Sequence, residues 1–579
     1  MPTGEVAEML SHVNPCLIIC ALIVFVVLQT PVKLYSYGVE PVCGRNGMVS
    51  SANEIASRIG ADVLAKGGNA VDAAVAVGFV LAVVHPQAGN VGGGGFMMIR
   101  ESGSGNVYAV DYRETAPSAA TRDMYLKPDG TVDNDASQIG YLAVGIPGTV
   151  KGLSEVHKKL GTMKWEELIR PAVQLAENGF KISYQQAQSL NSYKEFFVRF
   201  SPSGIFICPE NRDWEPGDLL IQKDLADTLR RIAEYGPDEF YTGETSRKFA
   251  SSVRNGGGII SAEDLANYTV KWREPLTGEF LGNRIYGMPL PSSGTVALLE
   301  ALNVFKHFSL KEYGQGSADF YHLFAETLRR VFRDRSFYMG DPDFVKVPLN
   351  ELLSPEYAKR QAAQISMDRA TDSKTLEGVL PLMDESENTT HFTTADKWGN
   401  VVSNTYTLNS SYGSKAVAGG TGILLNNEMD DFSLKAGASN QFDLIESEAN
   451  AISPGKRMLS SMTPLIIVKE GEYVMTMGSP GGPMIISSVL QALLNVVVFD
   501  MNIQEAVNAP RIHHQWLPDE IKMEKYGFAP EVRKMLESRG HKLTERKYMG
   551  DVHVIIHILK SGLFMGASDP RLEGRAVGY

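Results

Sequence analysis

The sequence lacks any long run of Lys or Arg, and its formal net charge is -12. Proteins that bind nucleic acid usually present a basic patch or stripe, so nucleic acid is not an expected partner. The sequence also shows no fixed-period repeat and no low-complexity tract. Hydrophobic residues make up 44% and charged residues 21%, values that exclude a largely disordered chain. The 579 residues are enough for several packed layers or for two lobes.

Cysteine is scarce, with only four in the chain. Cys16 and Cys20 lie in an apolar run, so only Cys43 and Cys208 remain for the folded part, and disulfides cannot be its main support. These two cysteines either form one bridge after export or stay as two thiols. The histidines, including His513 and His514, show no metal-ligand spacing, and a structural role is expected for them.

The N-terminus carries a charge-free apolar run over residues 15–32. This run is long for the core of a signal peptide and slightly short for a membrane span. The residues before it contain Glu5 and Glu8 but no Lys or Arg, unlike the basic start of a signal peptide. We predict that residues 1–36 direct export, to the periplasm or outside the cell. Whether they act as a cleaved signal or as a single-pass anchor stays open.

Two helices are predicted near the start of the folded part. Residues 52–66 have helical apolar spacing and are followed by two glycines. Asn69 is a suitable N-cap for a second helix over 70–84, which is apolar on all sides and must be buried between layers. The four glycines at 92–95 predict a tight passage of backbone past other backbone or a ligand.

The spacing of the apolar residues changes at Thr389, from one typical of helices to one typical of strands. Residues 389–396 and 401–407 predict two strands joined by a turn at 397–400. Further strands are predicted at 421–425, 462–468, 473–477, 552–559 and 563–567, and a long apolar helix at 483–498. Helices thus dominate the first two-thirds and β-structure the last third, which suits sheets between helical layers.

Several motifs occur in a fixed order along the chain. They are His85-Pro86-Gln87-Ala88-Gly89-Asn90, Asp111-Tyr112-Arg113-Glu114, Asn388-Thr389-Thr390-His391-Phe392, Thr407-Leu408-Asn409, Asn426-Asn427-Glu428-Met429-Asp430-Asp431, Ser460-Ser461-Met462, Gly478-Ser479-Pro480-Gly481-Gly482 and Gly566-Ala567-Ser568-Asp569-Pro570-Arg571. In order and spacing they resemble the signature of the γ-glutamyltransferase (glutathione hydrolase) family. The resemblance runs from about Val49 to Tyr579.

The resemblance implies an α+β fold, the four-layer αββα sandwich of the N-terminal-nucleophile hydrolases. It also implies cleavage between Asn388 and Thr389, which gives a large subunit over 37–388 and a small subunit over 389–579, intertwined in one unit. A threonine hydroxyl is a weak nucleophile without a base. A threonine at a new N-terminus carries its own base, because an α-amino group has a pKa of about 8. By propensity alone, Thr389 would be an ordinary strand residue. Thr390 is the neighbouring alternative, and its side chain would point to the opposite face.

The resemblance assigns the remaining site residues. Thr407 hydrogen-bonds the nucleophile, and the amides of Gly481 and Gly482 form the oxyanion hole at a strand-to-helix turn. The donor's α-carboxylate would bind the planar guanidinium of Arg113, which can donate two hydrogen bonds at once. The hydroxyls of Ser460 and Ser461 would donate further hydrogen bonds to it. Its α-ammonium would bind Asn409, Glu428 and Asp431. Taken alone, Arg113 and Asp431 would be surface ion-pair residues, and the glycines an ordinary turn.

The resemblance also implies the reaction. The enzyme attacks glutathione or another γ-glutamyl amide, forms a γ-glutamyl-threonine ester, and gives the acyl group to water or to an amino acid or peptide. It needs no cofactor and no metal. Residues 435–453 are predicted to form a lid over the site, with Phe442 as an aromatic gate, and an ordinary surface loop is the alternative.

Three other functions compete with this one. A cephalosporin or glutaryl acylase would not need to bind an α-ammonium, so Glu428 and Asp431 argue against it. A poly-γ-glutamate depolymerase would need residues 435–453 absent or displaced. A non-catalytic, membrane-tethered γ-glutamyl binding protein would lose Thr389 or the glycine turn, and this chain keeps both.

Overall fold

The computed structural model describes residues 39–209, 212–376, 389–435 and 447–579. The predicted export segment, Asn388 and Phe442 therefore lie outside the described residues. Pro41–Tyr579 forms one compact unit. No helix among the described residues is long and apolar enough to cross a membrane.

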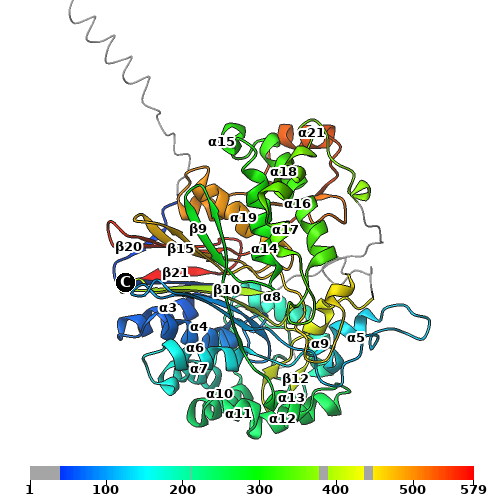
Figure 1. Ribbon diagram of the computed structural model, residues 1–579. Coiled ribbons are helices and arrows are strands. Elements are labelled where there is room, and N and C mark those ends of the chain that lie inside the picture. The colour runs from blue at the N-terminus through cyan, green and yellow to red at the C-terminus, as the bar shows by residue number, and fades with distance from the viewer. Residues whose placement is uncertain (1–38, 210–211, 377–388, 436–446) are drawn as a thin grey trace, which may run out of the picture. The chain divides into compact units, whose positions relative to one another are not determined.

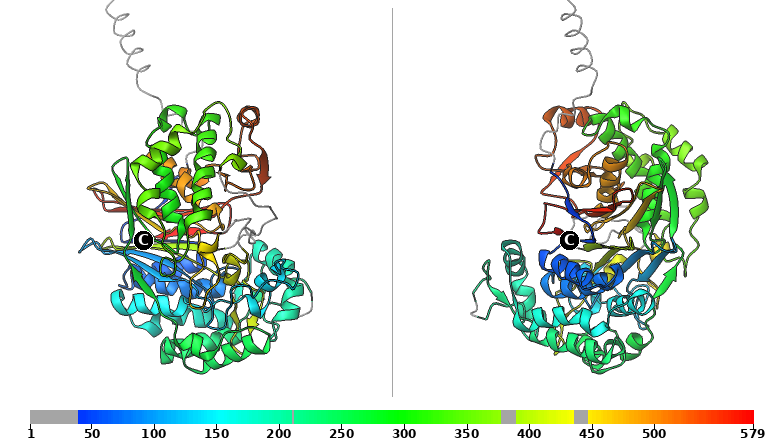
Figure 2. Two further views of the ribbon diagram at one scale, coloured as in Figure 1. Left: turned by 45° about the vertical axis from the view of Figure 1, so that its right-hand side comes forward. Right: turned by 90° about the vertical axis from the view of Figure 1, so that its left-hand side faces the viewer.

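Two seven-stranded sheets form the centre of this unit (Figures 1 and 2). The first has the order β1-β20-β19-β15-β14-β9-β8 and the second β21-β2-β10-β11-β3-β4-β7, and within both all neighbours are antiparallel. The strands of the first sheet are β1 (Val42–Gly44), β8 (Leu276–Phe280), β9 (Asn283–Gly287), β14 (Leu465–Lys469), β15 (Tyr473–Gly478), β19 (His553–Ile558) and β20 (Leu563–Ser568). Those of the second are β2 (Gly47–Ser51), β3 (Gly94–Arg100), β4 (Val107–Tyr112), β7 (Lys271–Arg273), β10 (Thr390–Asp396), β11 (Val401–Thr407) and β21 (Arg575–Gly578).

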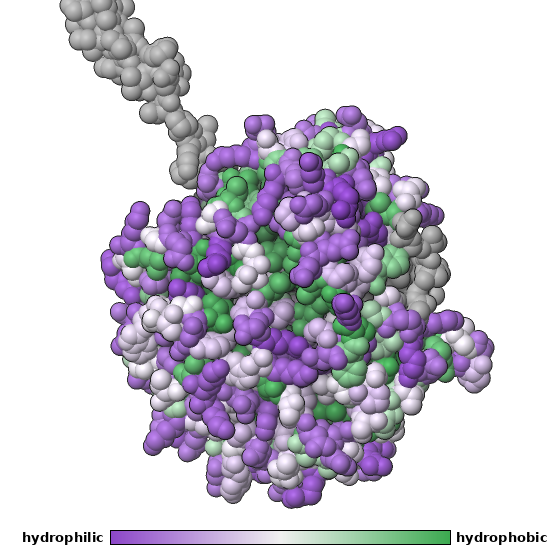
Figure 3. All heavy atoms as spheres, in the orientation of Figure 1, coloured by the Kyte–Doolittle hydropathy of each residue, from purple (hydrophilic) through white to green (hydrophobic). Residues whose placement is uncertain are grey.

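Helices cover the outer faces of both sheets (Figure 1). On the second sheet lie α3 (Glu54–Ala65), α4 (Ala70–Val84) and α6 (Thr149–Leu160), with α7 (Trp165–Asn178) and α10 (Lys223–Tyr235) packed farther out. On the first lie α14 (Ser293–Phe305) and α19 (Met484–Val497), with α16 (Ala318–Tyr338) packed against α14. The result is the four-layer αββα sandwich that the resemblance implies. On the face drawn in Figure 3, polar residues predominate, with hydrophobic ones interspersed.

Helix α4 shows how the sequence sets this arrangement. Every residue of the helix is buried, as its almost wholly apolar sequence predicts. Asn69 accepts a hydrogen bond from the Asp72 amide and donates its own backbone amide to the Asp72 carboxylate, so the predicted N-cap is a full capping box. The prediction for the four glycines also holds. A Cβ atom added at Gly93 would lie 2.0 Å from the Thr407 carbonyl oxygen, so backbone passes directly against backbone there.

The predicted distribution of strands was wrong. Half of the strands in the two large sheets precede residue 388, although only helices and turns were predicted there in any number. Strand β2 is buried throughout, and β3 is buried except at its last residue, so neither has the alternation of polar and apolar residues that marks a one-sided strand. Smaller differences occur at 421–425, where only β13 (Ile423–Leu424) forms, and at β14, which begins three residues later than predicted.

The remaining described elements surround the two sheets. The helices are α5 (Asn134–Gln138), α8 (Tyr184–Ser192), α9 (Lys194–Phe200), α11 (Asp238–Tyr241), α12 (Glu244–Asn255), α13 (Ala262–Ala266), α15 (Leu310–Tyr313), α17 (Leu349–Leu352), α18 (Pro355–Ala363), α20 (Ile503–Asn508) and α21 (Pro530–Ser538). The strands are β5 (Phe180–Lys181), β6 (Leu219–Leu220), β12 (Val417–Ala418), β16 (Ile512–His513), β17 (Ile521–Glu524) and β18 (Leu543–Arg546).

Candidate active site

Thr389 lies immediately before β10, at the open end of the β10–β11 hairpin. Thr390 pairs with Tyr406 in this hairpin, so the register brings Thr389 opposite Thr407. The Oγ1 atoms of Thr389 and Thr407 are 3.4 Å apart, and the Thr407 oxygen also accepts the Asn409 amide at 2.7 Å. Thr389 is 8% exposed, whereas Thr390 is fully buried and its hydroxyl has no hydrogen-bond partner among the described residues. Of the two threonines, Thr389 is therefore the one open to a substrate.

The glycine turn joins β15 to α19 beside Thr389. Gly481 and Gly482 have φ values of 127° and 52°, which favour glycine over residues with a Cβ atom. The Gly481 carbonyl accepts the Met484 amide at 3.0 Å, so the turn leads directly into the first turn of α19. The positive end of the dipole of α19 is thus beside the candidate nucleophile, where negative charge would develop during acyl transfer.

A buried cluster of charged side chains lies on one side of Thr389. Arg113 follows β4, and its Nη1 and Nη2 atoms are 2.6 Å from the Glu428 carboxylate and 2.5 Å from the Asp431 carboxylate. Both carboxylates come from the short helix η3 (Glu428–Asp431). The Asp431 Oδ1 atom and the Ser461 hydroxyl have no hydrogen-bond partner among the described residues. Buried polar groups of this kind are costly, so the site contains atoms that a polar ligand could pair.

Burial and charge change the pKa values in this cluster. Burial lowers the pKa of Arg113, but Glu428, Asp431 and Glu114 outweigh this effect and keep it above its ordinary value. Burial raises the pKa values of Glu428 and Asp431 against the opposing effect of Arg113. Burial also raises the pKa of Glu114 to about 8. The carboxyl groups around Arg113 therefore take up protons more readily than exposed ones.

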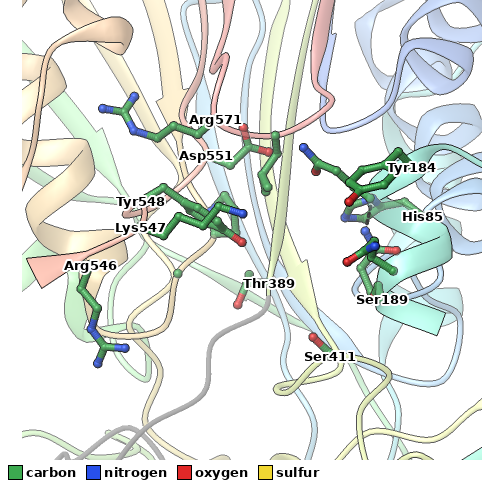
Figure 4. A pocket seen from close by; sticks show the side chains of 17 residues that line it. His85, Tyr184, Ser189, Thr389, Ser411, Arg546, Lys547, Tyr548, Asp551 and Arg571 are labelled. Atoms are coloured by element: carbon green, nitrogen blue, oxygen red, sulfur yellow. Dashed lines mark hydrogen bonds between the residues drawn. The ribbon is translucent and has the colours of Figure 1, made fainter. Parts of the chain in front are cut away.

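Two cavities meet at Thr389. The smaller, of about 20 Å³, is named the donor cavity after the predicted donor-binding residues in its lining. It is lined by Arg113, Arg335, Thr389, Thr407, Asn409, Asp431, Leu459, Ser460, Ser461, Met462, Gly482, Pro483 and Ile485. The larger, of about 480 Å³, is the outer cavity, and Figure 4 shows Thr389 between its two walls. Gly482 lines the donor cavity and Gly481 the outer one, so the glycine turn separates the two spaces.

Most of the predicted donor residues gather around the smaller cavity. Arg113, Asn409, Asp431, Ser460 and Ser461 line it. Glu428 does not line this cavity. It is fully buried, and its carboxylate contacts the Arg113 guanidinium.

Sequence reasoning missed Arg335, which comes from the last turn of α16 and is 1% exposed. Its Nε atom donates to the Ser293 hydroxyl at 3.0 Å, and its side chain lines the donor cavity. No spacing in the sequence marks it, because α16 carries other buried arginines, Arg329 and Arg330, that do not line this cavity.

Histidines pack beneath the site. The rings of His391 and His553 stack with centroids 6.3 Å apart, and His391 Nδ1 is 2.8 Å from the Thr405 hydroxyl. Burial lowers the pKa of His391 well below its ordinary value and that of His85 to about 4, in each case with His553 as a second cause. His85 and His391 are therefore neutral at physiological pH.

Other predictions about polar residues can be compared with the structure. His513 is buried, with its ring nitrogens 2.9 Å from the Ser487 hydroxyl and 2.8 Å from the Gln515 amide oxygen, which fits a structural role. Cys43 is exposed and Cys208 is buried, and both are free thiols. Among the described residues, no group of three or more His, Cys, Asp or Glu is arranged to hold a metal ion.

Comparisons with known proteins give one consistent result. Residues 56–579 match the family model described as Gamma-glutamyltranspeptidase. The chain is 46% identical over 556 residues to the glutathione hydrolase proenzyme of Escherichia coli strain K12, which covers 95% of each chain. Among solved structures, it resembles a cephalosporin acylase from Bacillus halodurans with a TM-score of 0.81 and 27% identity, over 95% of this chain and 99% of that one. It also resembles a Helicobacter pylori gamma-glutamyltranspeptidase with a TM-score of 0.54 and 44% identity, over 59% of this chain and 95% of that one.

Proposed function

This chain belongs to the gamma-glutamyltranspeptidase family, and from that premise we propose that Thr389 is its nucleophile. The family is one of self-processed N-terminal-nucleophile enzymes that hydrolyse and transfer γ-glutamyl groups, and this chain is such an enzyme, made as a precursor that is cleaved into two subunits. The proposed cleavage point is the Asn388–Thr389 bond, which gives subunits over 37–388 and 389–579. The observation that carries the proposal is the position of Thr389, with its hydroxyl 3.4 Å from that of Thr407 where the two cavities meet.

We propose the following reaction at these positions. The freed amine of Thr389 takes the hydroxyl proton as Oγ1 attacks the γ-carbonyl carbon, and the amides of Gly481 and Gly482 stabilise the oxyanion. The C–N bond then breaks, and the leaving nitrogen receives that proton. Water, or the amine of an amino acid or peptide, attacks the ester, loses its proton to the Thr389 amine, and Oγ1 leaves and is reprotonated. No cofactor takes part in these steps.

The charged side chains around the donor cavity suit a ligand that carries both charges of an α-amino acid. Arg113 is held by Asp431, so a zwitterion can exchange partners with this pair, its carboxylate taking Arg113 and its ammonium taking Asp431. Ser460 and Ser461 add hydroxyl donors for the carboxylate, and Asn409 adds an oxygen for the ammonium. Glu428 acts through Arg113, whose position it fixes. Glutathione is the proposed donor.

The competing function with a specific observation behind it is an acylase, because one of the similar solved structures is a cephalosporin acylase. A glutaryl acyl group has no α-ammonium, so it would supply no N–H donor to the Asp431 Oδ1 atom, the carboxylate oxygen that Arg113 does not contact. Buried polar groups are normally paired, so the unpartnered Asp431 Oδ1 atom favours the γ-glutamyl donor.

The variant Asp431→Asn separates these two functions. It keeps the shape of the side chain and removes the charge, and it should still mature. The wild type should prefer a γ-glutamyl anilide to a glutaryl anilide. The variant should lose most of that preference, because removing the charge of one partner in a buried charged contact costs about 2–5 kcal/mol. Steady-state kinetics with both anilides measure it, and a preference unchanged in the variant would exclude Asp431 as the ammonium site.

The proposed location is outside the cytoplasm, with export directed by residues 1–36. The proposal rests on the charge-free run at 15–32. Sequencing the large subunit of the purified enzyme tests whether these residues are removed.

A further inference from the structure

The outer cavity has two unlike walls on either side of Thr389 (Figure 4). Helix α8 forms one wall with uncharged polar side chains, among them Gln185, Gln188 and Ser189. The chain that follows β18 forms the other, with Arg546, Lys547 and Tyr548 in sequence. The volume, about 480 Å³, lies in the range of about 300–1,000 Å³ that small-molecule sites occupy.

The positive side chains that line the outer cavity are not equally available to a ligand. The Arg571 guanidinium is already engaged, with its Nε and Nη2 atoms donating to the two Glu524 carboxylate oxygens at 2.6 Å and its Nη1 atom to Asp569 at 3.0 Å. Lys547 is exposed, and within the described part of the chain no carboxylate lies within ion-pair distance of its ammonium. Lys547 therefore offers a charge that the fold itself does not use.

A second group in the same cavity points to a ligand. Asp551 is fully buried, and its Oδ2 atom is 3.1 Å from His553 Nε2. Its Oδ1 atom has no hydrogen-bond partner among the residues that the structure covers. A buried carboxylate oxygen without a donor is unusual in native proteins. An amine bound in the cavity beside Asp551 would supply the missing N–H.

The position of the outer cavity limits what that amine can be. If the γ-glutamyl part lies in the donor cavity, the leaving nitrogen must depart on the other side of Thr389, into the outer cavity. An acceptor amine attacks the same carbonyl carbon in the reverse sense, so by microscopic reversibility it uses the same space. The leaving dipeptide of glutathione and an acceptor amino acid or peptide share one feature, a carboxylate close to the reacting amine.

With the outer cavity as the space of the leaving group and the acceptor, we infer that Lys547 is the residue that recognises their carboxylate, with Arg546 adding positive charge and Asp551 facing the amine. This inference rests on the proposed function of Thr389. It gives Lys547 a role in specificity that is separate from the chemistry at Thr389.

The test compares two acceptors that differ only in the carboxylate, glycylglycine and glycylglycinamide. The donor is γ-glutamyl p-nitroanilide, whose leaving group has no carboxylate. The variants are Lys547→Met and Lys547→Glu, and Lys534→Met serves as the matched control because Lys534 is an exposed lysine of α21 that does not line the cavity. The measured quantity is kcat/KM for glycylglycine divided by kcat/KM for glycylglycinamide. The amines of the two acceptors differ in intrinsic reactivity, but this difference is the same for every variant, so it cancels when the ratios of two variants are compared.

The wild type should favour glycylglycine. Lys547→Met should lower that ratio about three- to fivefold, the scale of an exposed ion pair, and Lys547→Glu should lower it further. Hydrolysis of the anilide without acceptor should stay within about twofold of wild type in both, as should every property of Lys534→Met.

Three results would overturn the inference. They are a wild type without preference for the carboxylate, a ratio unchanged in both Lys547 variants, and a loss of anilide hydrolysis parallel to the loss of transfer. A wild type that does not hydrolyse the anilide at all would instead refute the proposed function.

Discussion

Glu114 is a buried residue whose charge state the fold constrains. It is fully buried, both of its carboxyl oxygens lack a hydrogen-bond partner in the described residues, and the Arg113 Nη1 atom is 3.6 Å away. Arg113 is closer to Glu428 and Asp431, so it compensates Glu114 only in part. Burial therefore raises the pKa of Glu114 to about 8, and the folded protein holds this group protonated at neutral pH.

This pKa predicts a pH dependence of stability. The unfolded carboxyl has a pKa of about 4.3, so unfolding releases a proton from Glu114 between that value and about 8. The contribution of Glu114 to stability is then fully present below about pH 4.3 and is lost as the pH rises towards 8. In Glu114→Gln the side chain at this position cannot ionise, so this part of the fall in stability with rising pH should be absent. The melting temperature of the wild type should fall more steeply between pH 5 and 9 than that of the variant. Glu470→Gln, at an exposed carboxyl, should follow the wild type. Parallel curves for wild type and Glu114→Gln would contradict the prediction.

For single residues, the sequence predicts which residue belongs to the site better than it predicts which residues that one contacts. The motif around Asn388 distinguishes Thr389 from Thr390, and the structure leaves only Thr389 on the cavities. The contact of Arg113 with Glu428 and Asp431 joins positions more than 300 residues apart, and no local pattern predicts it. Arg335 was missed for the same reason, because only the packing of α16 brings it to the donor cavity.

Among the elements, the β10–β11 hairpin has the most direct influence on the chemistry. It was predicted from sequence to within one residue, because both strands are rich in β-branched residues and a tight turn joins them. Strands β2 and β3, which flank this hairpin in the sheet, were not predicted, because strands buried on both faces lack the alternating pattern.

The hairpin predicts a role for one hydroxyl. Thr407→Val keeps the shape of the side chain and removes the oxygen that lies 3.4 Å from Thr389 Oγ1 and accepts the Asn409 amide. Losing a hydrogen bond of about 0.5–1.5 kcal/mol should reduce kcat for γ-glutamyl anilide hydrolysis up to about tenfold, with a smaller change in KM. Thr407→Ser keeps the oxygen and should stay close to wild type. Equal rates for the Val and Ser variants would show that the hydroxyl has no part in catalysis.

Over the whole unit, both large sheets combine strands from the two sides of the proposed cleavage point. In the second sheet, β10 lies between β2 and β11, and β11 between β10 and β3, so strands from before and after residue 388 are direct neighbours. Cleavage of one peptide bond leaves these backbone hydrogen bonds intact. The same holds in the first sheet, where β1 pairs with β20 and β9 with β14.

This topology predicts that the two subunits cannot separate without unfolding. They should elute as one species in size-exclusion chromatography in native buffer and separate only in denaturant, since separation would expose both sheets and the core between them. Two species in native buffer would contradict sheets that combine strands from both subunits.

In the proposed maturation, cleavage turns Thr389 into the N-terminus of the small subunit and makes it the nucleophile. The most direct measurement is N-terminal sequencing of the smaller band of the purified enzyme, with the Thr389→Ala protein purified beside it. The wild-type small subunit should begin Thr-Thr-His-Phe, and the variant should remain one full-length chain without γ-glutamyl activity. A small subunit that begins at Thr390, or a Thr389→Ala protein that is cleaved and active, would exclude Thr389 as the nucleophile.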